Sequence, residues 1–174
     1  MIVLDGVKAG ALLFVAAVIQ VSILNSVTVI GGTPNLLLIT LCAVALMRGS
    51  IFGAVGGFFA GIVVDTATLD TMGVTALLLT LAGYWIGRYG ETTGRGRHAP
   101  VLAVGVVTIL YSLASLLVRF MLGEGVSPEA VLLDALPPSL LFNLLLAYPV
   151  YLFCRWVLSL GRDTQPVREV RLIE

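Results

Sequence analysis

Charged residues are scarce in this chain of 174 residues. Asp, Glu, Lys and Arg together make up 11% of it, whereas hydrophobic residues make up 59%. Soluble domains have about 25% charged and about 45–50% apolar residues, so the composition excludes an ordinary soluble domain. The formal net charge is zero, and we therefore expect no nucleic-acid partner, because such proteins carry an excess of positive charge.

Residues that build disulfides, metal sites and catalytic sets are also rare. The chain has two cysteines and one histidine. Cys42 and Cys154 lie in separate apolar runs without metal-ligand spacing, and His98 lies in a charged segment. No Ser-His-Asp set, carboxylate pair, phosphate-binding loop or metal cluster is visible in the sequence. We therefore expect no catalytic residues, no metal, no cofactor and no enzymatic activity.

What the chain does contain is a series of apolar runs that reach or approach the length needed to cross a bilayer. These predict an all-α polytopic membrane protein with six transmembrane helices and short loops. The predicted spans are 7–24, 34–47, 51–64, 73–86, 100–121 and 138–160. Residues 1–160 then form one membrane domain, and 161–174 form a charged cytoplasmic tail. Residues 123–135 form an acidic connection that is long enough for a short surface helix.

The second and third spans are short, so residues 34–64 can also be interpreted as one helix with Arg48 at its centre. A charge at the bilayer centre costs about 2.5–3.5 kcal/mol or more. Two spans joined at Arg48 avoid this cost. With six spans and both termini cytoplasmic, Arg119 is the only Lys or Arg near the outer face, as the positive-inside rule favours. We therefore prefer six spans to five.

The most distinctive motif is a ladder of glycines at four-residue spacing. Its members are Gly49, Gly53, Gly57 and Gly61, and the next step of the ladder is Asp65. In a helix, residues four apart lie along one ridge. In a membrane, a ridge of glycines lets another backbone approach closely. The ladder and the neighbouring Phe58 therefore predict a packing surface, either for another helix of this chain or for a helix of a partner.

Polar residues at the ends of the predicted spans have several interpretations. Asp65 is a helix-end cap at the outer interface, an ion-pair partner of Arg119, or a transport site; no second intramembrane acid or base accompanies it, which favours the cap. Pro34 fits a helix start, with Thr33 as its N-cap. Asn143 lies inside a span, and we expect it to hydrogen-bond a neighbouring helix.

The stretch between residues 20 and 87 resembles the rod shape-determining protein MreD family. The resemblance rests on a Pro-Asn pair that opens an apolar helix, a glycine turn, a Gly-Phe-x-x-Gly segment that ends in Asp, and a Gly before the next helix. The matching residues are Gln20, Pro34, Asn35, Gly49, Gly57, Phe58, Gly61, Asp65 and Gly73. Asn35 stands where this family commonly has aspartate, which weakens any role for a charge there.

This resemblance implies a subunit of the cell-elongation machinery in the bacterial inner membrane. Such a protein binds the single-span protein MreC, and through it associates with MreB, RodA and the transpeptidase partner of RodA. It helps to assemble and regulate sidewall peptidoglycan synthesis and has no catalytic activity of its own. A homodimer and a bound membrane lipid are further alternatives for its contacts.

The MreD resemblance also implies a fold similar to the substrate-binding subunits of energy-coupling-factor transporters. The alternative function is therefore a vitamin-like small-molecule binding subunit of a transporter. Transporters usually place polar groups and broken helices at the membrane midplane. The midplane of this chain is almost wholly apolar, with Asn143 as the main exception, and this favours the assembly function.

Overall fold

The computed structural model describes residues 2–23, 33–69, 71–93, 99–123, 125 and 129–159. Within these residues the chain is all-α, as predicted, with six α-helices and one π-helical turn, η2. The elements are α1 (Ile2–Ser22), α2 (Leu36–Arg48), α3 (Ser50–Thr68), α4 (Val74–Thr93), α5 (Ala99–Met121), η2 (Ala130–Ala135) and α6 (Leu136–Ser159). The predicted tail, 161–174, lies outside the described residues.

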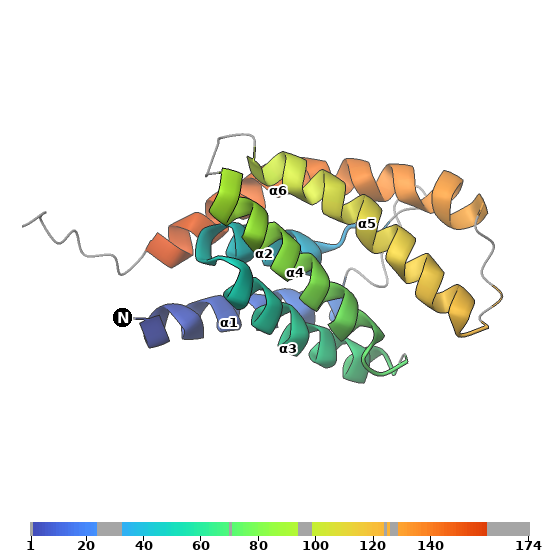
Figure 1. The fold of residues 1–174 in the computed structure, drawn as a ribbon, viewed down its shortest axis with the longest axis horizontal. Coiled ribbons are helices and arrows are strands. Elements are labelled where there is room, and N and C mark those ends of the chain that lie inside the picture. The colour runs from blue at the N-terminus through green and yellow to red at the C-terminus, as the bar shows by residue number, and fades with distance from the viewer. Residues whose placement is uncertain are drawn as a thin grey trace, which may run out of the picture.

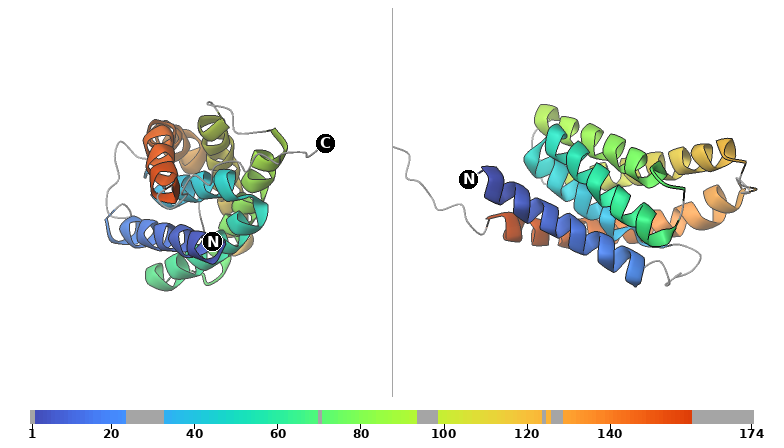
Figure 2. Two further views of the ribbon diagram at one scale, coloured as in Figure 1. Left: turned by 90° about the vertical axis from the view of Figure 1, so that its left-hand side faces the viewer. Right: turned by 90° about the horizontal axis from the view of Figure 1, so that it is seen from below.

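Helix α2 is the centre of the bundle, and the other five helices surround it (Figures 1 and 2). Every residue from Leu37 to Leu46 is buried. A helix of 13 residues rises only about 20 Å, whereas the hydrocarbon core of a bilayer is about 30 Å thick. The ends of α2 therefore lie inside the bundle, where their backbone groups need partners from the protein.

Gly49 separates α2 from α3. Its φ of 94° is in the region that glycine adopts more readily than other residues, and its N–H still donates to the carbonyl of Ala45 at 2.8 Å. Helix α2 ends at Arg48, and α3 begins at Ser50. The chain thus turns at the charged residue, and the alternative of a single helix over 34–64 is wrong.

Three predicted boundaries differ from the structure. Asn35, and not Thr33, is the N-cap of α2, because the Asn35 side chain accepts a hydrogen bond from the Leu38 N–H at 3.0 Å. Helix α4 continues to Thr93 instead of ending near residue 86. Residues 130–135 of the acidic connection form η2, which leads directly into α6 and is not a separate surface helix.

In the part of the chain that the structure describes, three helices are each long and apolar enough to cross a membrane: Ser50–Thr68, Pro100–Met121 and Val131–Ser159. Shorter apolar helices cover Gly6–Ser22 and Leu36–Arg48. Large hydrophobic side chains such as Ile51, Trp85 and Phe120 are exposed on the outside of the bundle, where lipid would cover them. These features fit the prediction of a polytopic membrane protein.

The two ends of the bundle differ in charge. At one end α2, α4 and α6 finish (Figure 1). Arg48 lies in the last turn of α2 at this end, and Arg88 and Arg155 lie in the C-terminal parts of α4 and α6. We call it the basic end. At the other end α2, α4 and α6 begin, and Arg119 is the one Lys or Arg among the residues described there. We call it the cavity end, because a polar cavity lies there.

Candidate functional site

The glycine ladder packs against α4 of the same chain. A Cβ atom built on Gly53 would overlap the carbonyl of Gly83, and one on Gly57 would overlap the carbonyl of Leu79. A Cβ on Gly61 would overlap the backbone of Ala76. The sequence left open whether another helix of this chain or a partner helix packs on this ridge. The structure shows that a helix of this chain, α4, does so. Phe58 is 46% exposed and does not share that buried face.

Helix α4 has its own glycines, which the sequence analysis missed. A Cβ on Gly83 would overlap the backbone of Gly53, and a Cβ on Gly87 would overlap the backbone of Ser50. Gly90 faces the backbone of Leu46 in α2, at 3.0 Å from a Cβ built there. The spacing of four and three residues between Gly83, Gly87 and Gly90 indicates a second helix face made of small residues. The close approach of α3 and α4 thus depends on glycine in both helices.

Asp65 caps the N-terminus of α4. It is 1% exposed, and its Oδ2 atom accepts hydrogen bonds from the N–H groups of Gly73 at 2.8 Å and Ala76 at 3.3 Å. Its Oδ1 atom accepts one from the N–H of Thr75 at 3.3 Å. The predicted cap is therefore present, although it caps the following helix instead of its own. The Asp65–Arg119 ion pair stays a prediction.

Glu91 forms a similar cap at the basic end. Its Oε1 atom accepts hydrogen bonds from the N–H of Ser50 at 2.7 Å and from the Ser50 hydroxyl at 3.0 Å. Glu91 lies beyond the apolar part of α4, outside the membrane-spanning segment. The two bonds from Ser50, the backbone one first, hold the pKa of the Glu91 carboxyl below its ordinary value of 4.5. Arg88 lies 3.6 Å away and lowers this pKa further.

A network of amide side chains caps the N-terminus of the central helix. Gln20 of α1 accepts a hydrogen bond from the Leu36 N–H at 2.7 Å and donates to the Pro34 carbonyl at 3.2 Å. Asn143 of α6 accepts one from the Asn35 N–H at 2.8 Å and donates to the Thr108 hydroxyl at 3.1 Å. The prediction that Asn143 bonds a neighbouring helix is confirmed. Thr108 was not predicted.

A polar cavity of about 460 Å³ lies beside this network, at the cavity end of the bundle. All six helices contribute to its wall. Its polar lining residues are Gln20, Thr33, Asn35, Thr68, Thr75, Thr108, Tyr111, Ser112, Ser115, Arg119, Ser139 and Asn143. Hydroxyl and amide groups therefore dominate the wall, and Arg119 brings a positive charge to it.

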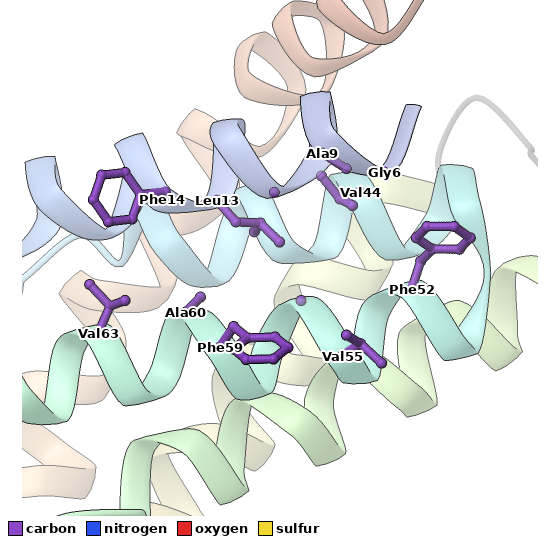
Figure 3. Close-up of a pocket in the computed structure, with 12 residues that line it drawn as sticks. Gly6, Ala9, Leu13, Phe14, Val44, Phe52, Val55, Phe59, Ala60 and Val63 are labelled. Atoms are coloured by element: carbon purple, nitrogen blue, oxygen red, sulfur yellow. The ribbon is translucent and has the colours of Figure 1, made fainter. Parts of the chain in front are cut away.

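A second cavity of about 400 Å³ is an apolar groove between α1 and α3 (Figure 3). Side chains of the two helices face each other across it, with Val44 of α2 at its floor. The groove combines small residues with exposed aromatic ones: Phe14 is 56% exposed and Phe59 is 63% exposed. Gly10 also lines it, and a Cβ built on Gly10 would meet nothing within 4 Å. We call this surface the α1–α3 groove.

The family model for rod shape-determining protein MreD matches residues 4–159, which include all of the features described above. The chain belongs to the MreD family. It is therefore a membrane protein of a family that determines cell shape.

Among relatives, the cell shape-determining protein MreD of Streptococcus pneumoniae (strain ATCC BAA-255 / R6) is 29% identical over 89 residues. This alignment covers 51% of the chain and 54% of the relative, so the chain spans about half the length of the curated relative that it matches. No solved structure matches the chain.

The residues that carry the MreD resemblance have physical roles in this structure. Gln20 and Asn35 cap the central helix. Asp65 and Gly73 join the end of α3 to the start of α4, and Gly73 adopts a φ of 96°, which favours glycine. The MreD-like motif is thus chiefly a set of helix caps and close helix contacts. Asn35 acts through its amide oxygen, so this position works without a carboxylate.

Proposed function

We propose that this protein is a non-catalytic membrane subunit of the bacterial cell-elongation complex. In this role it binds a single-span MreC-like protein, and through it associates with MreB, RodA and the transpeptidase partner of RodA. It thereby helps to assemble and regulate sidewall peptidoglycan synthesis. Membership of the MreD family supports the role in cell shape, and the partners are our proposal.

The observation that carries the proposal is the α1–α3 groove. A partner helix needs an apolar surface with small residues that permit close approach and aromatic residues that add contact area. The groove offers both, because Gly6, Gly10 and Gly56 line it together with Phe14 and Phe59. The face of the glycine ladder does not offer this surface, because α4 covers it.

The proposed orientation places the basic end in the cytoplasm. Arg48, Arg88 and Arg155 lie there, and cytoplasmic ends of membrane proteins are enriched in Lys and Arg. The N-terminus of α1 and the C-terminus of α6 lie at the same end, so both chain termini are then cytoplasmic. The cavity end faces the outside of the cell membrane.

The test is to fill the α1–α3 groove without disturbing the fold. Gly10→Leu places a large side chain in the groove, and nothing beyond the neighbouring backbone of α1 lies within 4 Å of the new Cβ. The matched control is Ala11→Leu, at the next position of the same helix, which is exposed and does not line the groove. We expect Gly10→Leu to reduce the amount of single-span partner that co-purifies by about tenfold or more, equivalent to about 1.4 kcal/mol.

Expression level and the thermal midpoint in detergent should be the same for both variants. Rod shape should be lost in cells that carry only the Gly10→Leu protein. If the partner co-purifies equally well with both variants, the groove is not the binding surface. A chain that co-purifies with a vitamin-sized ligand and an ATPase, and not with a single-span protein, would contradict the assembly function.

A further inference from the structure

The polar cavity at the cavity end has no role in the proposed assembly function, although it is larger than the α1–α3 groove. Its volume of about 460 Å³ falls in the range of small-molecule sites, which is about 300–1,000 Å³. A membrane protein gains nothing from polar side chains around an empty space, since polar groups in a bilayer are costly. A hydrophilic wall of this kind fits a hydrophilic occupant.

The charged residues of the wall favour a ligand with one sign of charge. Arg119 lines the cavity, and the described residues of its lining include no Asp or Glu. Asp65 directs its oxygens to backbone N–H groups at the start of α4 and is not among the residues that line the cavity. A cationic ligand would find no carboxylate among the described residues of this wall, whereas an anion would meet a guanidinium group.

The hydroxyl groups of the wall favour a ligand that carries hydrogen-bond donors. Thr68 donates its proton to the Val64 carbonyl at 2.9 Å, and Ser139 donates its proton to the Ala135 carbonyl. Each oxygen keeps lone pairs that can accept a further hydrogen bond. A ligand that satisfies this wall therefore combines an anionic group with hydroxyl donors.

The wall is also preorganised. Asn143 is held by the Asn35 N–H and the Thr108 hydroxyl, and the side chains of Gln20 and Asn35 are held by backbone groups at the start of α2. Among the described residues, no buried side-chain nitrogen or oxygen lacks a partner. A ligand that enters this cavity therefore does not have to order it first, which removes part of the usual cost of binding.

We propose that the polar cavity binds a phosphate ester that carries hydroxyl groups. The phosphate binds at Arg119, and the hydroxyls bind among the Thr and Ser residues deeper in the wall. Such a group can be the head group of an anionic lipid such as phosphatidylglycerol, or a soluble ester such as glycerol phosphate. Arg119 also lines a small adjoining cavity of about 40 Å³ beside α4 and α5. Because Arg119 is exposed, we place it at the rim of the polar cavity, where a head group would enter.

The experiment uses the full chain purified in detergent. Native mass spectrometry measures adducts with phosphatidylglycerol and, separately, with phosphatidylethanolamine, while calorimetry measures binding of glycerol phosphate. We expect one retained phosphatidylglycerol or one bound glycerol phosphate per chain, and weaker retention of phosphatidylethanolamine. Retention of the lipid with no binding of the soluble ester identifies a lipid head group, and the reverse identifies a soluble ligand.

Two variants and a control locate the site. Arg119→Gln should weaken binding by about tenfold or more, because it removes a charge-assisted hydrogen bond. Arg155→Gln removes an exposed arginine at the basic end and should leave binding unchanged. Ser115→Val keeps the charge at Arg119 but adds bulk and removes a hydroxyl from the wall, so it tests the site even if Arg119→Gln fails to fold.

The proposal is overturned if neither phosphate ester binds, or if phosphatidylethanolamine is retained as strongly as phosphatidylglycerol. It is also overturned if a folded Ser115→Val protein binds as the unmodified chain does. None of these outcomes affects the α1–α3 groove, whose test measures a protein partner. Failure of this proposal is therefore distinguishable from failure of the proposed function.

Discussion

Asp65 and Glu91 stand at opposite ends of the α3–α4 pair, and each carboxylate accepts hydrogen bonds from the N-terminal backbone of the other helix. A negative charge is favoured at a helix N-terminus, where unpaired N–H groups and the positive end of the helix dipole meet. The two caps therefore fix the register of α3 against α4. Between them, facing glycines bring the two backbones together.

Gly57→Ala should destabilise the protein, because the added Cβ would overlap the carbonyl of Leu79 in the tightly packed α3–α4 pair. Overpacking of this kind costs about 1–3 kcal/mol. Gly10→Ala is the matched control, since its Cβ would meet nothing within 4 Å, and it should be neutral or slightly stabilising. Unfolding midpoints in detergent check the difference. Equal midpoints would show that α3 and α4 can separate without cost.

Asp65→Asn should also lower the unfolding midpoint, because the variant loses the charge that stabilises the first turn of α4. The Asn amide keeps one oxygen acceptor and replaces the other with an NH2 group, so part of the N-cap interaction is lost. Its complete loss costs about 0.5–2 kcal/mol. Thr66→Val, at the next position, removes a hydroxyl that bonds only within α3 and should have a smaller effect. A Thr66→Val effect as large as that of Asp65→Asn would argue against a special role for the cap.

Glu91→Gln should make stability less dependent on pH. The folded protein lowers the pKa of the Glu91 carboxyl, so this group contributes stability above its unfolded pKa of about 4.5 and loses that contribution as the pH falls through the lower folded value. At neutral pH the unmodified chain should unfold at a higher temperature than Glu91→Gln. The gap should close in acid. A gap that stays constant down to the acid limit would assign the effect to packing instead of charge.

Much of this fold follows from local sequence patterns. Apolar runs predict six helices, and the cost of burying Arg48 separates α2 from α3 at Gly49. Four-residue spacing predicts a close contact along the glycine ladder, but it does not say which helix makes that contact. That information lies in the glycines of α4 and in the two carboxylate caps, which join residues far apart in the sequence.

The polar cavity is even harder to predict from local sequence patterns. Gln20, Asn35 and Asn143 are recognisable singly as polar residues at or within predicted spans. Their hydrogen bonds cross separations of up to 108 residues, so no local pattern reveals that they cap one helix. The hydroxyls that complete the wall are ordinary Ser and Thr residues of membrane helices. Only the packing of all six helices gathers them around one space.

The Asn143–Thr108 hydrogen bond provides a direct measure of this non-local network. Asn143→Ala should cost about 1–3 kcal/mol, because it leaves the half-buried Asn35 N–H without its acceptor. Thr108→Val should cost less, since it removes only one partner of the Asn143 amide. The double variant should be less destabilised than the sum of the two, by about 0.6 kcal/mol, a typical value for such bonds in membranes. Strict additivity would show that the two side chains act independently.

The orientation of the bundle can be tested with single cysteines. The native Cys42 and Cys154 are 0% and 1% exposed, so they should react little with a bulky maleimide. Leu122→Cys places a thiol at the cavity end, where Leu122 is 49% exposed, and Thr92→Cys places one on the exposed surface of the basic end. Neither position lines the α1–α3 groove.

A membrane-impermeant maleimide applied to intact protoplasts should label Leu122→Cys and leave Thr92→Cys unmodified. Permeabilised protoplasts should show labelling of both, which controls for the reactivity of each thiol. This result follows if Arg48, Arg88 and Arg155 lie on the cytoplasmic side, as the positive-inside rule requires. The reverse pattern would place both termini outside, and the polar cavity would then open toward the cytoplasm and its soluble phosphate esters.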